Sequence, residues 1–189
     1  MKYTEKVIQI MKSRCEYLQV LKKEKEKLDS LLSAERIGAA DHHDKIQAMQ
    51  KEYDDTFMET RNQLYELIPN YNNAVDDSLD LNGTMLNDDV RILSTPNLEL
   101  TKHQLQAIAD RNHDNPLVCQ MLRTRIDEET RKGKDVYIDG LPASKEVKKQ
   151  MFLNFVNLSA NAAKDCSGIS AAMIMENRCT PKECTEVAN

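Results

Sequence analysis

The sequence has no tryptophan and little phenylalanine, glycine or proline. There are three Phe, five Gly and five Pro among its 189 residues. Because Phe and Trp supply most of the bulk of a large aromatic core, their scarcity argues against such a core. Glycine and proline interrupt helices, so the small number of each favours long helices without breaks.

The chain also lacks a long apolar run and a surplus of positive charge. No stretch of about 18 apolar residues occurs, so we expect no membrane span and no membrane partner. The first residues, Met-Lys-Tyr-Thr-Glu-Lys, lack the apolar centre of a signal peptide, which predicts a cytoplasmic location. The net charge of −5 disfavours binding to a nucleic acid backbone. Five cysteines, an odd number, fit free thiols in a reducing compartment.

Signatures of catalysis are missing as well. The sequence contains no nucleophile elbow, no Walker loop and no glycine-rich dinucleotide turn. His42 and His43 are adjacent, so their side chains diverge and cannot form the paired ligands of a metalloprotease helix. Acidic residues occur throughout, and no carboxylate pair stands out. We therefore predict a protein that is not an enzyme and has no cofactor.

The first third of the chain predicts two long helices. Residues 2–36 contain no Gly or Pro, and their apolar side chains recur at alternating spacings of four and three, which is typical of a seam that faces a partner helix. Gly38 is the predicted stop, Asp41 the predicted N-cap of the second helix, and Pro69 its predicted end. The predicted self-association seam comprises Val7, Met11, Leu18, Leu21, Leu28 and Leu32, then Ile46, Met49, Tyr53, Phe57 and Leu64.

A short connection between two long helices implies an antiparallel hairpin over residues 1–68. Charge supports the pairing, since residues 1–37 have a net charge of +3 and residues 38–68 a net charge of −4. Arg14 and Lys25 interrupt the apolar seam, so an ideal two-stranded zipper is not expected. Because such a rod buries little surface by itself, we expect it to pack on another chain or on the rest of this one.

Residues 69–100 are predicted to be an acidic linker with a short helix over residues 84–93. Part of this linker matches positions 1, 3, 5, 6 and 12 of a calcium-binding loop, although Ser replaces the usual acid at position 1 and Asp replaces Glu at position 12. The alternative, which we favour, is an acidic loop with a glycine turn. The matching residues are Ser78, Asp80, Asn82, Gly83 and Asp89.

Residues 101–168 are predicted to form a compact helical domain. Thr101 and Gln104 form a capping box for one helix, and Asp114 or Asn115 caps the next, with Pro116 in its first turn. Ser144 opens a last long helix that reaches about residue 165, and its predicted apolar face comprises Met151, Phe152, Phe155, Val156 and Leu158.

A charged cluster and two cysteines are candidate binding sites. A basic cluster on the second of these helices alternates with acids, which favours a solvated, salt-bridged face: Arg123, Arg125, Arg131 and Lys132 among Asp127, Glu128 and Glu129. The C-terminal tail, residues 169–189, contains Cys179 and Cys184. Zinc is disfavoured there because a structural site needs four converging ligands.

Residues 91–126 carry a family resemblance. Along this stretch, a leucine and a polar turn precede the Leu100-Thr101 cap of a helix, and Asp114-Asn115-Pro116 then opens another helix. This order, after a Lys/Glu-rich hairpin, resembles small helical head-module proteins, scaffold or accessory, of tailed bacteriophages and of prophages of Gram-positive bacteria. The resemblance implies a structural or assembly role with a capsid or other virion protein as partner, and a location in the host cytoplasm or the virion.

The sequence therefore predicts an all-α fold, in which a long, coiled-coil-like antiparallel hairpin precedes a compact bundle of shorter helices. The predicted function is that of a homo-oligomeric structural or assembly protein, derived from a phage or prophage, that self-associates through its hairpin and contacts a capsid. The alternative is a small helical binding module that regulates a host protein.

Overall fold

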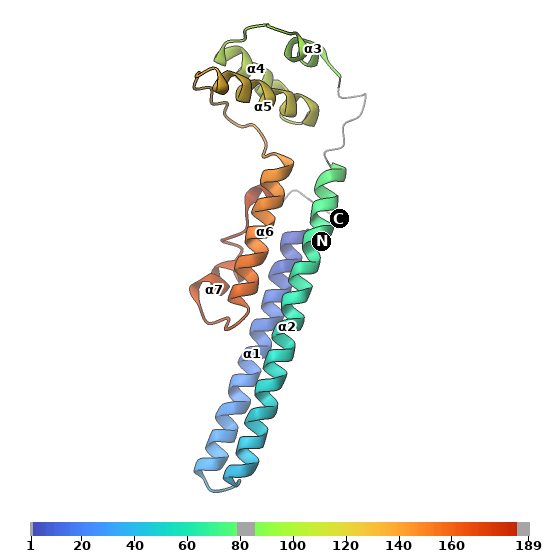
Figure 1. The fold of residues 1–189 in the computed structure, drawn as a ribbon. Coiled ribbons are helices and arrows are strands. Elements are labelled where there is room, and N and C mark those ends of the chain that lie inside the picture. The colour runs from blue at the N-terminus through green and yellow to red at the C-terminus, as the bar shows by residue number, and fades with distance from the viewer. Residues whose placement is uncertain (1, 79–85, 185–189) are drawn as a thin grey trace. The chain divides into compact units, whose positions relative to one another are not determined.

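The computed structural model describes residues 2–78 and 86–184, and within these ranges every regular element is a helix (Figure 1). The predicted all-α fold, with a long hairpin of α1 and α2 and a set of shorter helices, is confirmed. The helices are α1 (Tyr3–Ser33), α2 (Ala39–Ser78), α3 (Asp88–Ser94), α4 (Lys102–Arg111), α5 (Pro116–Arg131), α6 (Lys145–Ala162), α7 (Ile169–Met175) and the short 3-10 helix η2 (Lys182–Cys184).

The first helix ends at Ser33, before the predicted stop at Gly38, and Glu35 lies in the turn that follows it. Glu35 adopts the left-handed conformation, with φ of 57°. The Arg36 N–H then donates to the Leu31 carbonyl oxygen at 2.9 Å, and the Glu35 N–H to Leu32 at 2.9 Å. These two bonds form the turn that glycine usually makes at a helix C-terminus. A glutamate fills the position because the bonds outweigh the modest cost of the left-handed backbone.

The second helix begins and ends at different residues from those predicted. It starts at Ala39, so Asp41 lies in its first turn and is not the N-cap. It also continues through Pro69 to Ser78. Proline removes one backbone hydrogen bond, but Tyr71 beyond it is fully buried. Its ring stacks on that of Phe152, with centroids 3.9 Å apart. This packing favours continuation of the helix past the proline.

The chain divides into two compact units, Met1–Ala74 with Lys149–Asn189, and Val75–Lys148. This division differs from the predicted boundaries at residues 68, 100 and 168. Most of α6 belongs with the hairpin, which it touches through the Tyr65 hydroxyl and Asn157 Oδ1 at 2.9 Å. The predicted C-terminal tail contributes to this unit too, because α7 and η2 bury Ala171, Ile174 and Cys184.

The apolar core of the first unit has a small aromatic centre. Tyr3 meets Tyr71 edge to face at 5.7 Å, and Phe152 at 6.3 Å. Phe155 and Val156 on the same face of α6 are also buried, as predicted, and Met151 is half-buried. The prediction for Leu158 is wrong, because 37% of this residue is exposed. Three rings thus form a compact cluster in a chain with few aromatic residues.

The second unit is built on α3, α4 and α5. The predicted capping box of α4 is confirmed, with the Gln104 N–H donating to Thr101 Oγ1 at 3.3 Å and the Thr101 N–H donating to Gln104 Oε1 at 2.8 Å. Asn115 caps α5, with Pro116 in the first turn. The short helix predicted at residues 84–93 is α3, which starts later, and its first predicted residues lie outside the described ranges. The buried core consists of Leu93, Leu105, Ile108, Ala109, Val118, Leu122 and Ile138.

Candidate functional site

A buried arginine lies where α1, α2 and the segment after α6 meet. Arg14 of α1 is only 3% exposed. Its Nε donates to the Ala163 carbonyl oxygen at 3.1 Å, and its Nη1 donates to Thr56 Oγ1 at 2.7 Å. Its Nη2 makes a longer contact of 3.5 Å with the Tyr53 carbonyl oxygen. One side chain therefore connects three segments of the first unit.

Three aromatic rings surround the Arg14 guanidinium. Its central carbon lies 4.8 Å from the ring centroid of Tyr53, 5.4 Å from that of Tyr17 and 5.8 Å from that of Phe57. The negative π faces of such rings stabilise a cation that has left water. Carbonyl and hydroxyl oxygens supply the hydrogen bonds. Arg14, which interrupts the apolar pattern in the sequence, is thus the centre of a polar and aromatic cluster.

The segment after α6 is attached to the hairpin by a second bond as well. The Tyr53 hydroxyl donates to the Lys164 carbonyl oxygen. The helix ends before the predicted residue 165, because Cys166 adopts a left-handed backbone with φ of 54°. Asp165 Oδ1 accepts the Ser167 N–H at 2.6 Å, and hydrogen bonding to the side chain and the backbone of Ser167 lowers the pKa of Asp165. The loop is therefore ordered at Ala163, Lys164 and Asp165.

Two cysteine thiols meet beside Arg14. Cys15 is buried, Cys166 is half-buried, and both are free thiols. Their interaction with each other raises the pKa of Cys15, as burial also does, and lowers the pKa of Cys166. The positive charge of Arg14 further lowers the pKa of Cys166. Of the two thiols, Cys166 is therefore the more acidic.

The predicted seam residues fall into two groups. Val7, Met11 and Leu64 are fully buried, whereas the remaining members are half-buried. Residues 16–59, all of which the structure describes, include no fully buried side chain. Tyr53 and Phe57 face Arg14. The half-buried apolar residues nearer the turn are Leu18, Leu21, Leu28, Leu31, Leu32, Ile46 and Met49.

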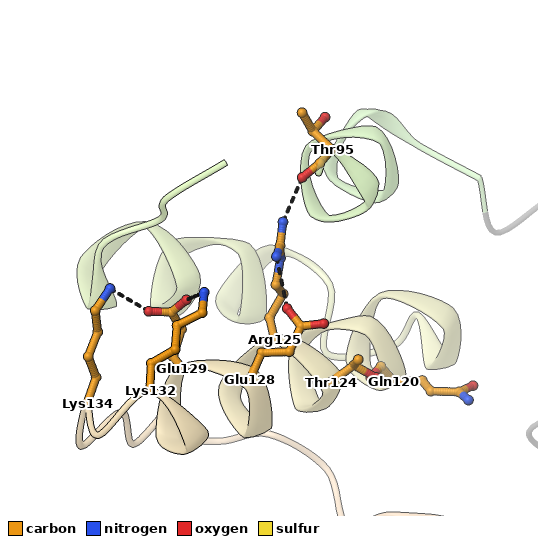
Figure 2. A network of polar contacts seen from close by, with 8 residues as sticks. All are labelled: Thr95, Gln120, Thr124, Arg125, Glu128, Glu129, Lys132 and Lys134. Atoms are coloured by element: carbon orange, nitrogen blue, oxygen red, sulfur yellow. Dashed lines mark hydrogen bonds and ion pairs between the residues drawn. The ribbon is translucent and has the colours of Figure 1, made fainter. Parts of the chain in front are cut away.

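The basic cluster of α5 is part of an ordered network and is less solvated than predicted (Figure 2). Arg125, whose side chain is 15% exposed, pairs with Glu128 at 2.9 Å and donates to the Thr95 carbonyl oxygen at 2.7 Å. Lys132 and Lys134 both pair with Glu129, at 2.7 and 2.6 Å. The predicted ion pairs are therefore present, and they connect α5 to the end of α3 and to the segment after α5.

Glu129 should make the second unit sensitive to acid. The hydrogen bonds from Lys132 and Lys134 lower the pKa of Glu129 from 4.5 to about 2. A carboxyl whose pKa is lowered by folding stabilises the fold above its unfolded pKa, and that contribution disappears as the pH falls towards the folded value. We expect wild type to be more stable than Glu129→Gln above pH 4.5, with the difference shrinking between pH 4.5 and about 2. Urea unfolding at a series of pH values measures this, and a constant difference would contradict the assignment.

The chain matches no family model, no curated protein and no solved structure. Function must therefore be inferred from the fold and from the chemistry of its residues. Across the described ranges, no helix combines the length and the apolar character needed to cross a membrane.

The candidate metal sites can be compared with the structure only in part. Three residues of the calcium-loop pattern, Asp80, Asn82 and Gly83, lie outside the described residues. Asp89 bonds through one oxygen to Arg111 and through the other to Asn112, at 2.8 and 2.7 Å, and these bonds lower its pKa. Within residues 2–78 and 86–184, no three His, Cys, Asp or Glu side chains are placed to hold a metal ion.

Proposed function

We propose that this chain is a non-enzymatic helical assembly protein that associates with a second copy of itself through the hairpin tip, defined as residues 18–49. The observation that carries the proposal is the partial burial of the apolar seam in this region. The seam is covered where α6 and α7 pack on the hairpin, and it is only half-covered in the tip. A second helical pair is the simplest structure that would cover it.

The free energy gained by burying the apolar side chains of the tip is comparable to the free-energy cost of association. Full burial of a Leu side chain contributes about 1.5–3 kcal/mol, so a half-buried one retains about 1 kcal/mol for association. The tip presents several such side chains, among them Leu28 and Leu32 of α1 and Ile46 and Met49 of α2. When both copies bury these side chains, the summed free energy offsets the cost of association, which is about 4–15 kcal/mol.

Charge favours a second copy as the occupant. Within the tip, residues 18–37 have a net charge of +1 and residues 38–49 a net charge of −1. In an antiparallel pair of hairpins, α1 of one copy lies beside α2 of the other, so the opposite charges face each other across the interface. Individual surface pairs contribute little, but together they select this orientation over one that juxtaposes like helices.

The partner of the assembled form is proposed to be a capsid or another virion protein. The resemblance of residues 91–126 to phage and prophage head-module proteins supports this identity, and with it a location in the host cytoplasm or the virion. The second unit, which contains these residues, would present the surface that the shell protein binds. Co-expression with a phage shell protein tests this partner separately from self-association.

Leu28→Asp should abolish self-association. The substitution introduces a charge into the half-buried seam of the tip, far from the fully buried residues of the unit. We expect the wild-type protein to show a mass that increases with concentration in light scattering, and the variant to remain a monomer of 21.6 kDa.

Val20→Asp is the matched control, because Val20 lies on the same helix and is 55% exposed. It should associate like the wild type. Circular dichroism must show the same helix content in all three proteins, so that loss of association is not loss of the hairpin. A wild-type protein that stays monomeric at every concentration would contradict the proposal.

A further inference from the structure

We propose that the C-terminal segment is a displaceable cover on the hairpin, and that its release lengthens the surface on which a second copy binds. We call residues 168–184, which include α7 and η2, the tail cover. Its α7 helix packs on α1, whose fully buried side chains all lie between Tyr3 and Cys15. The inference rests on the proposed self-association, because it concerns how that association is limited.

The apolar seam of α1 is continuous along the helix, but its covering is not. Val7 and Met11 are fully buried, whereas Leu18 and Leu28 further along are half-buried. The change comes just after Arg14, which is bonded to the loop that leads into the tail cover. The tail cover therefore lies on the continuation of the face that we assign to a second copy in the tip.

Few contacts attach the tail cover to the hairpin. The α7 helix has seven residues, too few to be stable alone, so packing must hold it in place. None of its side chains is charged, so it forms no ion pair, and only Ala171 and Ile174 of α7 are fully buried. Cys184 of η2 is buried as well, whereas Ile169 on the outer side is 80% exposed. Release of the tail cover thus costs little buried surface.

The tail cover begins where the hydrogen bonds of the preceding loop end. Arg14 holds the Ala163 carbonyl, and the Tyr53 hydroxyl holds that of Lys164. Gly168 follows as the N-cap of α7, and nothing lies within 4 Å of the place where its side chain would begin. A joint at this residue allows the tail cover to move while the loop, α1, α2 and α6 stay packed.

Release of the tail cover lengthens the paired surface and favours a second copy as its replacement. Antiparallel hairpins paired by their tips overlap along about 24 Å of α1, whereas pairing along the whole helix covers about 46 Å. In the longer pair, the tip of one copy lies on the base of the other. Residues 1–17 have a net charge of +2 and residues 50–68 a net charge of −3, so each lies beside an oppositely charged helix.

Hydrogen exchange of the full-length wild type tests whether the tail cover opens by itself. We expect the amides of α7 to exchange about tenfold faster than those of α6, because α7 is released locally while α6 stays packed. Equal protection of the two helices would overturn the proposal, since the tail cover would then open only when the whole unit unfolds. This measurement needs no variant.

Ile174→Asp in the full-length protein tests the effect on association. The charge enters the fully buried contact of α7, so the concentration needed for association in light scattering should fall about tenfold. Ser170→Asp, on the exposed side of α7, is the matched control and should associate like the wild type. Adding Leu28→Asp to Ile174→Asp should reverse the gain, because the longer surface includes the tip. Circular dichroism must show no loss beyond that of a seven-residue helix.

The outcomes separate this inference from the proposed function. If the wild type associates and Ile174→Asp does so no more tightly, the tail cover alone is overturned. If the wild type stays monomeric and Ile174→Asp associates, the tip is insufficient by itself and the tail cover is supported as an inhibitory contact. If both stay monomeric, or if Leu28→Asp leaves the association of Ile174→Asp unchanged, the continuous seam is not the interface and the inference is overturned.

Discussion

Phe152→Ala is expected to lower the free energy of unfolding by about 3–5 kcal/mol, the cost of removing a large buried ring and leaving a cavity. Phe152 of α6 is fully buried. It stacks on Tyr71 of α2 and meets Tyr3 of α1 edge to face. One residue thus connects the three long helices of the first unit, and its neighbours cannot move inwards without breaking the stack. Urea unfolding followed by circular dichroism measures the change.

Leu158→Ala is the control for this experiment, since Leu158 lies on the same helix and is 37% exposed. We expect its cost to be about 1 kcal/mol or less, because a partly exposed side chain loses little burial. Equal losses for the two variants would show that packing in the aromatic cluster does not set the cost.

Arg14→Ala should have the second-largest effect, a loss of about 2–4 kcal/mol. The substitution leaves the Ala163 carbonyl and the Thr56 hydroxyl without their donors, and it empties the space between three aromatic rings. Hydrogen bonds from a charged donor contribute more than neutral ones. The loop after α6 also loses its hydrogen bond to α1.

Lys12→Ala provides the comparison, because Lys12 is an exposed basic residue on the same helix. Its effect should lie within about 0.5 kcal/mol of zero. Arg14→Lys keeps the charge but cannot reproduce the planar fork of hydrogen bonds, so it should also be destabilising. A stable Arg14→Ala variant would show that the buried guanidinium does not connect the three segments.

Local signals in the sequence predicted local structure well. The capping box of Thr101 and Gln104 and the cap at Asn115 depend on groups within three residues of each other, so their geometry follows from a short stretch of chain. The hairpin was predictable for a similar reason, because the spacing of apolar residues repeats along each helix.

Features set by distant residues were missed. The apolar pattern marks Arg14 only as an interruption of the seam, because its acceptor at Ala163 lies far away in the sequence. The local sequence predicts a helix end at Pro69, because the packing of Tyr71 on Phe152 cannot be derived from the residues around the proline. The meeting of Cys15 and Cys166 has the same origin, and the spacing of the five cysteines gave no signal of it.

The distribution of buried side chains along the hairpin also has a dynamic consequence. Full burial on α1 ends at Cys15 and on α2 resumes at Thr60. Local opening of a helix costs less where fewer side chains are buried, so the free energy of opening falls from the junction with α6 towards the turn at Glu35. The hairpin thus has a rigid base and a tip that opens first, and the tip can adapt its shape to another surface without unfolding the base.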